Sequence, residues 1–154
     1  MTLSAGDKAP DFDLPTEDGR VSLAGLKGKM VVLYFYPKDD TSGCTAEAQG
    51  FTEAASDFLA AGAVVIGVSK DSVASHQKFK AKYGLTPLYA SAKDHDMVER
   101  YGAWVEKSMY GRKYMGIDRS TYLIDGEGVI RKIWRKVKVP GHVAEVLAAV
   151  KVLG

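Results

Sequence analysis

The only cysteine of the chain lies where a buried strand is expected to end and a helix to begin. Cys44 follows a polar turn, which itself follows the apolar run of residues 31–36, and it opens a segment with helical spacing. At a helix start, free backbone N–H groups and the positive end of the helix dipole favour a thiolate over a thiol. Because its neighbours are polar, we expect Cys44 to be a reactive nucleophile rather than a buried structural thiol.

Residues 35–47, Phe-Tyr-Pro-Lys-Asp-Asp-Thr-Ser-Gly-Cys-Thr-Ala-Glu, resemble the active-site segment of the peroxiredoxins. The resemblance is greatest to the bacterioferritin-comigratory (peroxiredoxin Q) branch. Residues 9–14 and 119–125 match further family patterns in the same order, so the resemblance covers nearly the whole chain. It implies an α/β protein with a thioredoxin-like fold and an N-terminal β-hairpin extension.

The resemblance implies a peroxidase in which three side chains do the chemistry. Cys44 would be the nucleophile that attacks hydrogen peroxide or an organic hydroperoxide, and Thr41 would hydrogen-bond the peroxide, besides being a good helix N-cap. Arg119 would contact both the thiolate and the peroxide. Its positive charge would favour the thiolate and stabilise the negative charge that develops on the departing oxygen.

Other residues near Cys44 are expected to shape the pocket. By resemblance, Pro37 would shield it, and Glu47 would hold the loop or Arg119 in place. Gly43 would let the substrate approach the backbone closely, where two N–H groups could bind an oxygen. Asp39 and Asp40 should point away from Cys44, since carboxylates aimed at the thiol would disfavour the thiolate.

Gln49 stands where many members of the family carry a second, resolving cysteine. Because the chain has a single cysteine, no internal disulfide can form. We therefore expect an external thiol reductant, either thioredoxin or glutaredoxin with glutathione, to regenerate Cys44. No cofactor is expected, and the scattered histidines at 76, 95 and 142 do not predict a zinc site.

The composition predicts one domain spanning residues 1–154, with 46% hydrophobic residues. The net charge of +2, from 21 basic and 19 acidic residues, predicts neither a nucleic-acid nor a membrane partner. No segment approaches the roughly 18 apolar residues of a membrane span. A lone thiol and the lack of a leader pattern predict a cytoplasmic protein. The sequence leaves monomer and homodimer open.

Hydrophobic periodicity predicts the order of the elements. A hairpin is expected over 9–23, followed by strands at 31–36 and 63–68 that flank a helix at 44–61. Such a β-α-β unit implies parallel pairing with a right-handed crossover. The remaining expected elements are a helix from 71 or 72 to 83, a strand at 88–89, a short helix at 97–101, an extended segment at 104–109 before a basic aromatic loop, a hairpin at 121–134 and a final helix from 140.

Two other functions fit parts of the sequence. A thioredoxin-like disulfide reductase would need Cys-x-x-Cys, but Thr41 occupies the first position. A non-catalytic thioredoxin-fold binding module or holdase would need no nucleophile, and the combination of Thr41, Cys44 and Arg119 weighs against it. The peroxidase remains the preferred hypothesis.

Overall fold

The structure is a computed structural model that describes residues 3–154, and it contains both strands and helices. The strands are β1 (Asp13–Thr16), β2 (Gly19–Ser22), β3 (Met30–Phe35), β4 (Ala63–Ser69), β5 (Leu88–Ser91), β6 (Trp104–Met109), β7 (Arg112–Ile117), β8 (Ser120–Ile124) and β9 (Ile130–Trp134). The helices are η1 (Ala24–Leu26), α1 (Ser42–Glu53), α2 (Ala55–Ala60), α3 (Val73–Tyr83), α4 (Met97–Arg100) and α5 (His142–Leu153).

A seven-stranded mixed sheet organises the molecule, in the order β2-β1-β5-β4-β3-β8-β9. Strand β4 pairs in parallel with β3 on one side and with β5 on the other. The antiparallel strands β8 and β9 extend the sheet beyond β3, and the β1–β2 hairpin extends it beyond β5. The predicted β-α-β unit, N-terminal hairpin and C-terminal hairpin are all confirmed.

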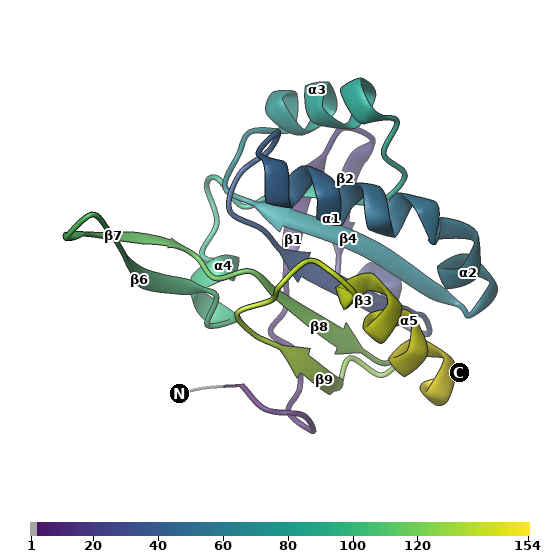
Figure 1. Cartoon of the computed structure of the whole chain (residues 1–154). Helices are drawn as coiled ribbons and strands as arrows, with labels where there is room; N and C mark the ends of the chain where they lie inside the picture. The colour runs from purple at the N-terminus through teal and green to yellow at the C-terminus, as the bar shows by residue number, and fades with distance from the viewer. Residues whose placement is uncertain (1–2) are drawn as a thin grey trace.

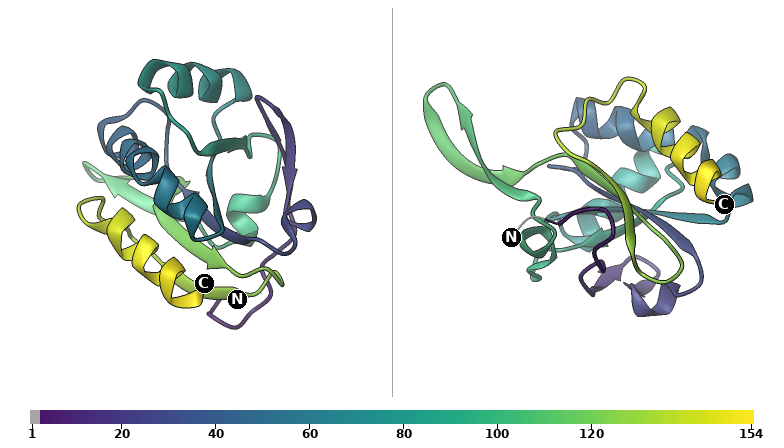
Figure 2. Two further views of the ribbon diagram at one scale, coloured as in Figure 1. Left: turned by 90° about the vertical axis from the view of Figure 1, so that its right-hand side faces the viewer. Right: turned by 90° about the horizontal axis from the view of Figure 1, so that it is seen from below.

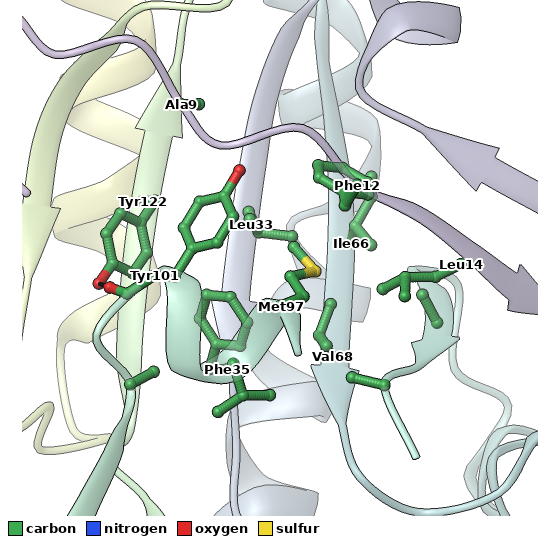
Figure 3. Packing of buried hydrophobic residues seen from close by; sticks show 14 of the residues in the cluster. Ala9, Phe12, Leu14, Leu33, Phe35, Ile66, Val68, Met97, Tyr101 and Tyr122 are labelled. Carbon is green, nitrogen blue, oxygen red and sulfur yellow. Dashed lines mark hydrogen bonds between the residues drawn. The ribbon is translucent and has the colours of Figure 1, made fainter. Parts of the chain in front are cut away.

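The two faces of the sheet bury separate apolar clusters, because side chains alternate along each strand. On β3, Val31, Leu33 and Phe35 enter one cluster, whereas Val32 and Tyr34 enter the other. The first cluster is closed by α4 and the segment before β1, and Figure 3 shows its aromatic and aliphatic side chains packed together. The second lies beneath α1, α2, α3 and α5, which gather on the opposite face (Figures 1 and 2).

The helix expected over 44–61 is in fact two helices, α1 and α2, separated at Ala54. The backbone of Ala54 has φ of −92° and ψ of 7°, which is outside the helical range. Phe51 and Phe58, on either side of the break, are each 1% exposed, with ring centroids 5.7 Å apart. The break therefore redirects the chain while both aromatic rings stay in the core, and apolar spacing alone does not reveal it.

The structure corrects the sequence prediction at residues 110–117. Strands β6 and β7 form a separate two-stranded sheet, joined by Tyr110 and Gly111 with φ of 51° and 77°. Two central residues with positive φ are typical of a tight hairpin turn. Strand β7 was missed because Arg112 to Met115 are exposed on both faces and show no apolar alternation. The hairpin projects from the body of the molecule (Figures 1 and 2).

Helix α3 lies where a helix from 71 or 72 to 83 is expected, and it is capped at both ends. The hydroxyl of Ser72 accepts a hydrogen bond from the Ser75 N–H, and Gly84 ends the helix with φ of 62°. Helix α3 is therefore fixed at both ends beside the loop that precedes α1. Within residues 3–154, no helix combines the length and the apolar character needed to cross a membrane.

Candidate active site

Cys44 is the third residue of α1, and its side chain is buried, with 2% of the residue exposed. The preceding Thr41 is extended, with φ of −101° and ψ of 157°, and its carbonyl accepts the hydrogen bond from the Thr45 N–H. The first N–H groups of a helix have no partner within the helix, so they collect at the end where Cys44 lies. This setting supplies partial positive charge beside the sulfur.

Arg119 lies between the sulfur of Cys44 and the carboxyl group of Glu47. Its Nη2 is 3.3 Å from Cys44 Sγ, and its Nη1 donates to Glu47 Oε1 at 2.7 Å. The sheet creates this contact, because Ser120 pairs with Phe35 at the end of β3, from which the chain leads into α1. The guanidinium is thus held in one orientation by a buried acid while it faces the thiol.

Gly43 makes room for the guanidinium. A Cβ atom at this position would lie 3.1 Å from Arg119 Nη2, closer than ordinary van der Waals contact. From the sequence, we expect the absent side chain to admit the substrate. In this structure the space at Gly43 adjoins Arg119, and a larger residue here would push the guanidinium away from Cys44.

Glu47 is completely buried, and burial raises the pKa of its carboxyl group to about 7, although Arg119 partly offsets this increase. Its Oε2 atom has no hydrogen-bond partner among residues 3–154. Partial burial disfavours the charge on Arg119, but Glu47 and Cys44 outweigh that effect and raise the pKa of the guanidinium. The site therefore contains a permanent cation between two acidic groups.

Thr41 occupies the N-cap position, but its side chain does not cap the helix. Its hydroxyl group donates instead to the Lys38 carbonyl at 2.9 Å. Because the proton is used there, the hydroxyl does not donate to sulfur in this geometry, whereas its lone pairs can still accept a hydrogen bond. Pro37 lies at the start of the same loop and is exposed.

Asp39 and Asp40 point toward α3, which confirms the expectation that they turn away from Cys44. Asp40 accepts hydrogen bonds from Lys82 Nζ at 2.8 Å and from the Tyr83 hydroxyl at 2.6 Å. Asp39 is buried and accepts from the Tyr36 hydroxyl at 2.5 Å. The loop before Cys44 is thereby fastened to the neighbouring helix by two consecutive carboxylates.

His76 is a buried partner of this loop that no pattern in the sequence reveals. Its Nδ1 is 2.7 Å from Asp39 Oδ2, and its Nε2 is 3.1 Å from the Ala90 carbonyl oxygen. The imidazole ring is thus held on both sides, by Asp39 and by the backbone of β5. Asp39 and His76 are 37 positions apart, and no local pattern links them.

Asp71 joins Asp39 and His76 in a cluster with the composition of a small metal site. Its Oδ2 atom, however, already accepts hydrogen bonds from the Asp39 N–H at 2.8 Å and from the Ser69 hydroxyl at 2.7 Å. The ligand atoms of the cluster are thus already engaged in hydrogen bonds within the protein. We interpret the cluster as a hydrogen-bond network that holds the loop before Cys44.

An aromatic layer lies beneath Cys44. Tyr34 stacks on Phe51 with centroids 4.6 Å apart, and its hydroxyl is 2.6 Å from that of Tyr89. Gly67 accommodates this pair, since a Cβ there would lie 2.6 Å from the Tyr89 ring. Burial raises the pKa of Tyr34, which keeps it neutral. In such an apolar layer the interaction between Arg119 and a thiolate is stronger than in water.

A helix-start cysteine beside an arginine from an adjacent strand, on a mixed sheet flanked by helices, defines a thiol site of the peroxiredoxin type. The AhpC/TSA family model matches residues 5–133. A putative peroxiredoxin Bcp of Coxiella burnetii is 57% identical over 96% of this chain and 98% of its own length. The peroxiredoxin Bcp of Bacillus subtilis is 49% identical, over 98% and 97% respectively.

The solved structures agree with the sequence relatives. The bacterioferritin comigratory protein of Xanthomonas campestris, studied for its alkyl peroxide reduction activity, superposes with a TM-score of 0.90 and 41% identity. The alignment covers 97% of this chain and 99% of that one. The chain belongs to the AhpC/TSA family and, within it, to the Bcp or peroxiredoxin Q group of thiol-dependent peroxidases. Its fold is thioredoxin-like.

Proposed function

We propose that the chain reduces hydrogen peroxide and organic hydroperoxides through a sulfenic acid on Cys44, and that an external thiol regenerates it. The observation that carries the proposal is the position of Arg119, 3.3 Å from Cys44 Sγ and 2.7 Å from Glu47 Oε1. A cation held in this way favours the thiolate that attacks the peroxide.

In the first step the Cys44 thiolate attacks one peroxide oxygen and the O–O bond breaks. Sulfur takes up that oxygen as a sulfenic acid, and the other oxygen leaves with the bonding electrons as hydroxide or alkoxide, which then takes a proton. Arg119 and the N–H groups at the start of α1 stabilise the departing negative charge. Thr41 accepts a hydrogen bond from the peroxide, and Pro37 shields the entrance.

The regeneration step needs thiols from outside the chain, because Cys44 is its only cysteine. The first external thiolate attacks the sulfenic sulfur, forms a mixed disulfide and releases water. A second thiol then attacks this disulfide and releases Cys44 as the thiolate. Candidate reductants are thioredoxin, and glutaredoxin with glutathione. The proposed compartment is the cytoplasm, where reducing conditions keep a single thiol available.

Burial of Cys44 constrains this second step. Only 2% of the residue is exposed, so a protein thiol can reach the sulfur only after the start of α1 or the loop before it moves. A small peroxide needs much less space. The hydrogen bonds that Asp39 and Asp40 accept from α3 are therefore contacts that regeneration must loosen.

A peroxide-consumption assay tests the proposal, with thioredoxin, glutaredoxin plus glutathione, and dithiothreitol supplied as reductants in parallel. We expect sustained consumption with dithiothreitol and with one of the protein systems, and a single turnover when no reductant is present. Failure to consume peroxide with any reductant would favour the non-catalytic binding module instead.

A further inference from the structure

The β6–β7 hairpin exposes an unusual set of side chains for a surface segment. Residues 109–115 are all exposed, and they include four large apolar side chains. Tyr110, at the tip, is 99% exposed, and Met109 is 57% exposed. Met115 and Tyr114 are exposed by 50% and 44% respectively. Apolar side chains gathered in this way mark a surface that binds a partner.

One face of the hairpin combines apolar groups with positive charge. Residues directly opposite in an antiparallel pair share a face, and Lys107 pairs with Tyr114 while Met109 pairs with Arg112. We call these four residues the hairpin face. On the other face, Glu106 lies 4.0 Å from Lys113 and offsets its charge. No acidic group among residues 3–154 forms a salt bridge with Lys107 or Arg112. The hairpin face therefore suits an acidic partner.

The hairpin is continuous with the active site. Strand β7 ends at Ile117, and the chain reaches Arg119 two residues later. The Asp118 N–H donates to the Ala103 carbonyl at 2.7 Å, which fixes the base of the hairpin. A partner bound along the hairpin would thus contact the segment that carries the arginine beside Cys44.

We propose that the hairpin face docks the protein reductant that regenerates Cys44, a dithiol protein whose reactive cysteine lies on an apolar surface edged by acidic groups. This inference rests on the proposed function. Six residues of strand extend about 20 Å, which suits a protein contact better than a small thiol. Tyr, Met and Arg, which make up most of the exposed tip, are enriched at the centres of protein interfaces.

The docked reductant carries out the regeneration in two displacements. Its first thiol loses its proton, and the thiolate attacks the sulfenic sulfur of Cys44. The S–O bond breaks as the S–S bond forms, and the departing hydroxide takes up a proton and leaves as water. The second thiol of the reductant then attacks the reductant's first sulfur, which is bonded to Cys44 in the mixed disulfide. This displacement releases Cys44 as the thiolate. The reductant leaves as a disulfide, having supplied the two electrons that reduced the peroxide.

The test compares a charge-reversed hairpin with a matched control. In the first variant Lys107→Glu and Arg112→Glu reverse the hairpin face. In the control, Lys27→Glu and Lys29→Glu make the same charge change at exposed positions before β3. Peroxide turnover is measured with a reduced thioredoxin of acidic isoelectric point, recycled by its reductase and NADPH, and separately with dithiothreitol.

We expect the hairpin variant to lose about tenfold in kcat/KM for thioredoxin, mainly through KM, because charge complementarity governs encounter. Turnover with dithiothreitol should change less than twofold, and the control should match the wild type with both reductants. Tyr110→Ser should weaken thioredoxin turnover without any change in charge. Added salt should slow the wild type with thioredoxin and leave the hairpin variant unaffected.

Several outcomes would overturn the docking proposal while leaving the peroxidase intact. One is an equal loss of thioredoxin turnover in both variants, and another is wild-type turnover that thioredoxin does not accelerate although dithiothreitol does. Sedimentation that shows a dimer dissociated by Tyr110→Ser would assign the hairpin to a second copy of the chain. Binding to phosphatidylserine vesicles that is lost in the hairpin variant would assign it to a membrane surface. Absence of turnover with dithiothreitol would instead contradict the proposed function.

Discussion

The Nη2 atom of Arg119 lies 3.3 Å from the sulfur of Cys44, although the two residues are 75 positions apart in the chain. The antiparallel pairing of β8 with β3 brings them together, and the ion pair with Glu47 fixes the guanidinium. Because the cation is already in place, we propose that it stabilises developing negative charge without reorganising during the reaction.

Replacing Arg119 should impair catalysis and thiolate formation together. Loss of one such contact costs about 2 to 4 kcal/mol of barrier, so Arg119→Met should lower kcat/KM for peroxide by roughly a hundred- to thousandfold. Iodoacetamide alkylation of Cys44, followed against pH, should need a higher pH to reach half its maximal rate. Arg119→Lys keeps the positive charge but loses the bidentate geometry of the guanidinium. Its kcat/KM should therefore lie between the values of the wild type and of Arg119→Met. An alkylation profile that does not move would refute the role of Arg119.

Glu47 should make stability fall as the pH rises. Its pKa of about 7 in the folded chain exceeds the ordinary value of 4.5, so between these limits the folded state holds a proton that the unfolded state has released. The difference in pKa corresponds to about 3 kcal/mol of stability. This stability is lost progressively as the pH rises to about 7. Glu47→Gln keeps an acceptor for Arg119 but does not titrate.

The free energy of unfolding in urea, measured from pH 4.5 to pH 8, tests this effect. The wild type should lose stability relative to Glu47→Gln across that range, by about 3 kcal/mol in all. Equal differences between the two proteins at pH 5 and at pH 8 would show that burial does not raise the pKa of Glu47 in the folded chain.

Removing His76 should destabilise the loop before Cys44. His76→Leu removes one hydrogen-bond partner of the buried Asp39 carboxyl group, which typically costs about 1 to 3 kcal/mol. The double variant with Asp39→Asn should be less destabilised than the sum of the single changes, because the two residues are in contact. Lys82→Met, which removes an exposed partner of Asp40, is the control and should have a much smaller effect. Additive losses in the cycle would contradict the coupling.

The single thiol determines what happens after one turnover. Mass spectrometry after one equivalent of peroxide should show a trappable sulfenic acid at Cys44, and glutathione should convert it to a mixed disulfide. Excess peroxide without a thiol should drive it to the sulfinic acid. Cys44→Ser should show none of these adducts and no peroxidase activity, with an unchanged circular dichroism spectrum. Recovery of the thiol without any added reductant would show the external-thiol mechanism to be wrong.

The local elements could be predicted from the sequence alone. The apolar run before the catalytic turn predicted strand β3, and the polar turn after it predicted a helix with Cys44 in its first turn. The helix expected from 71 or 72 to 83 matches α3. Such features depend on side chains within a few positions of one another, so a linear pattern records them.

The contacts between distant segments were decided only by the tertiary structure. The Asp39–His76 pair, the packing of Tyr34 against Tyr89, and the position of Gly43 against Arg119 all join segments that no period in the sequence connects. Strand β7 was also invisible, because a hairpin that projects from the body buries too little surface to impose an alternating pattern. Strand register and helix packing fix these relationships through the burial of the whole core, and that burial is a property of the folded chain rather than of any one stretch of it.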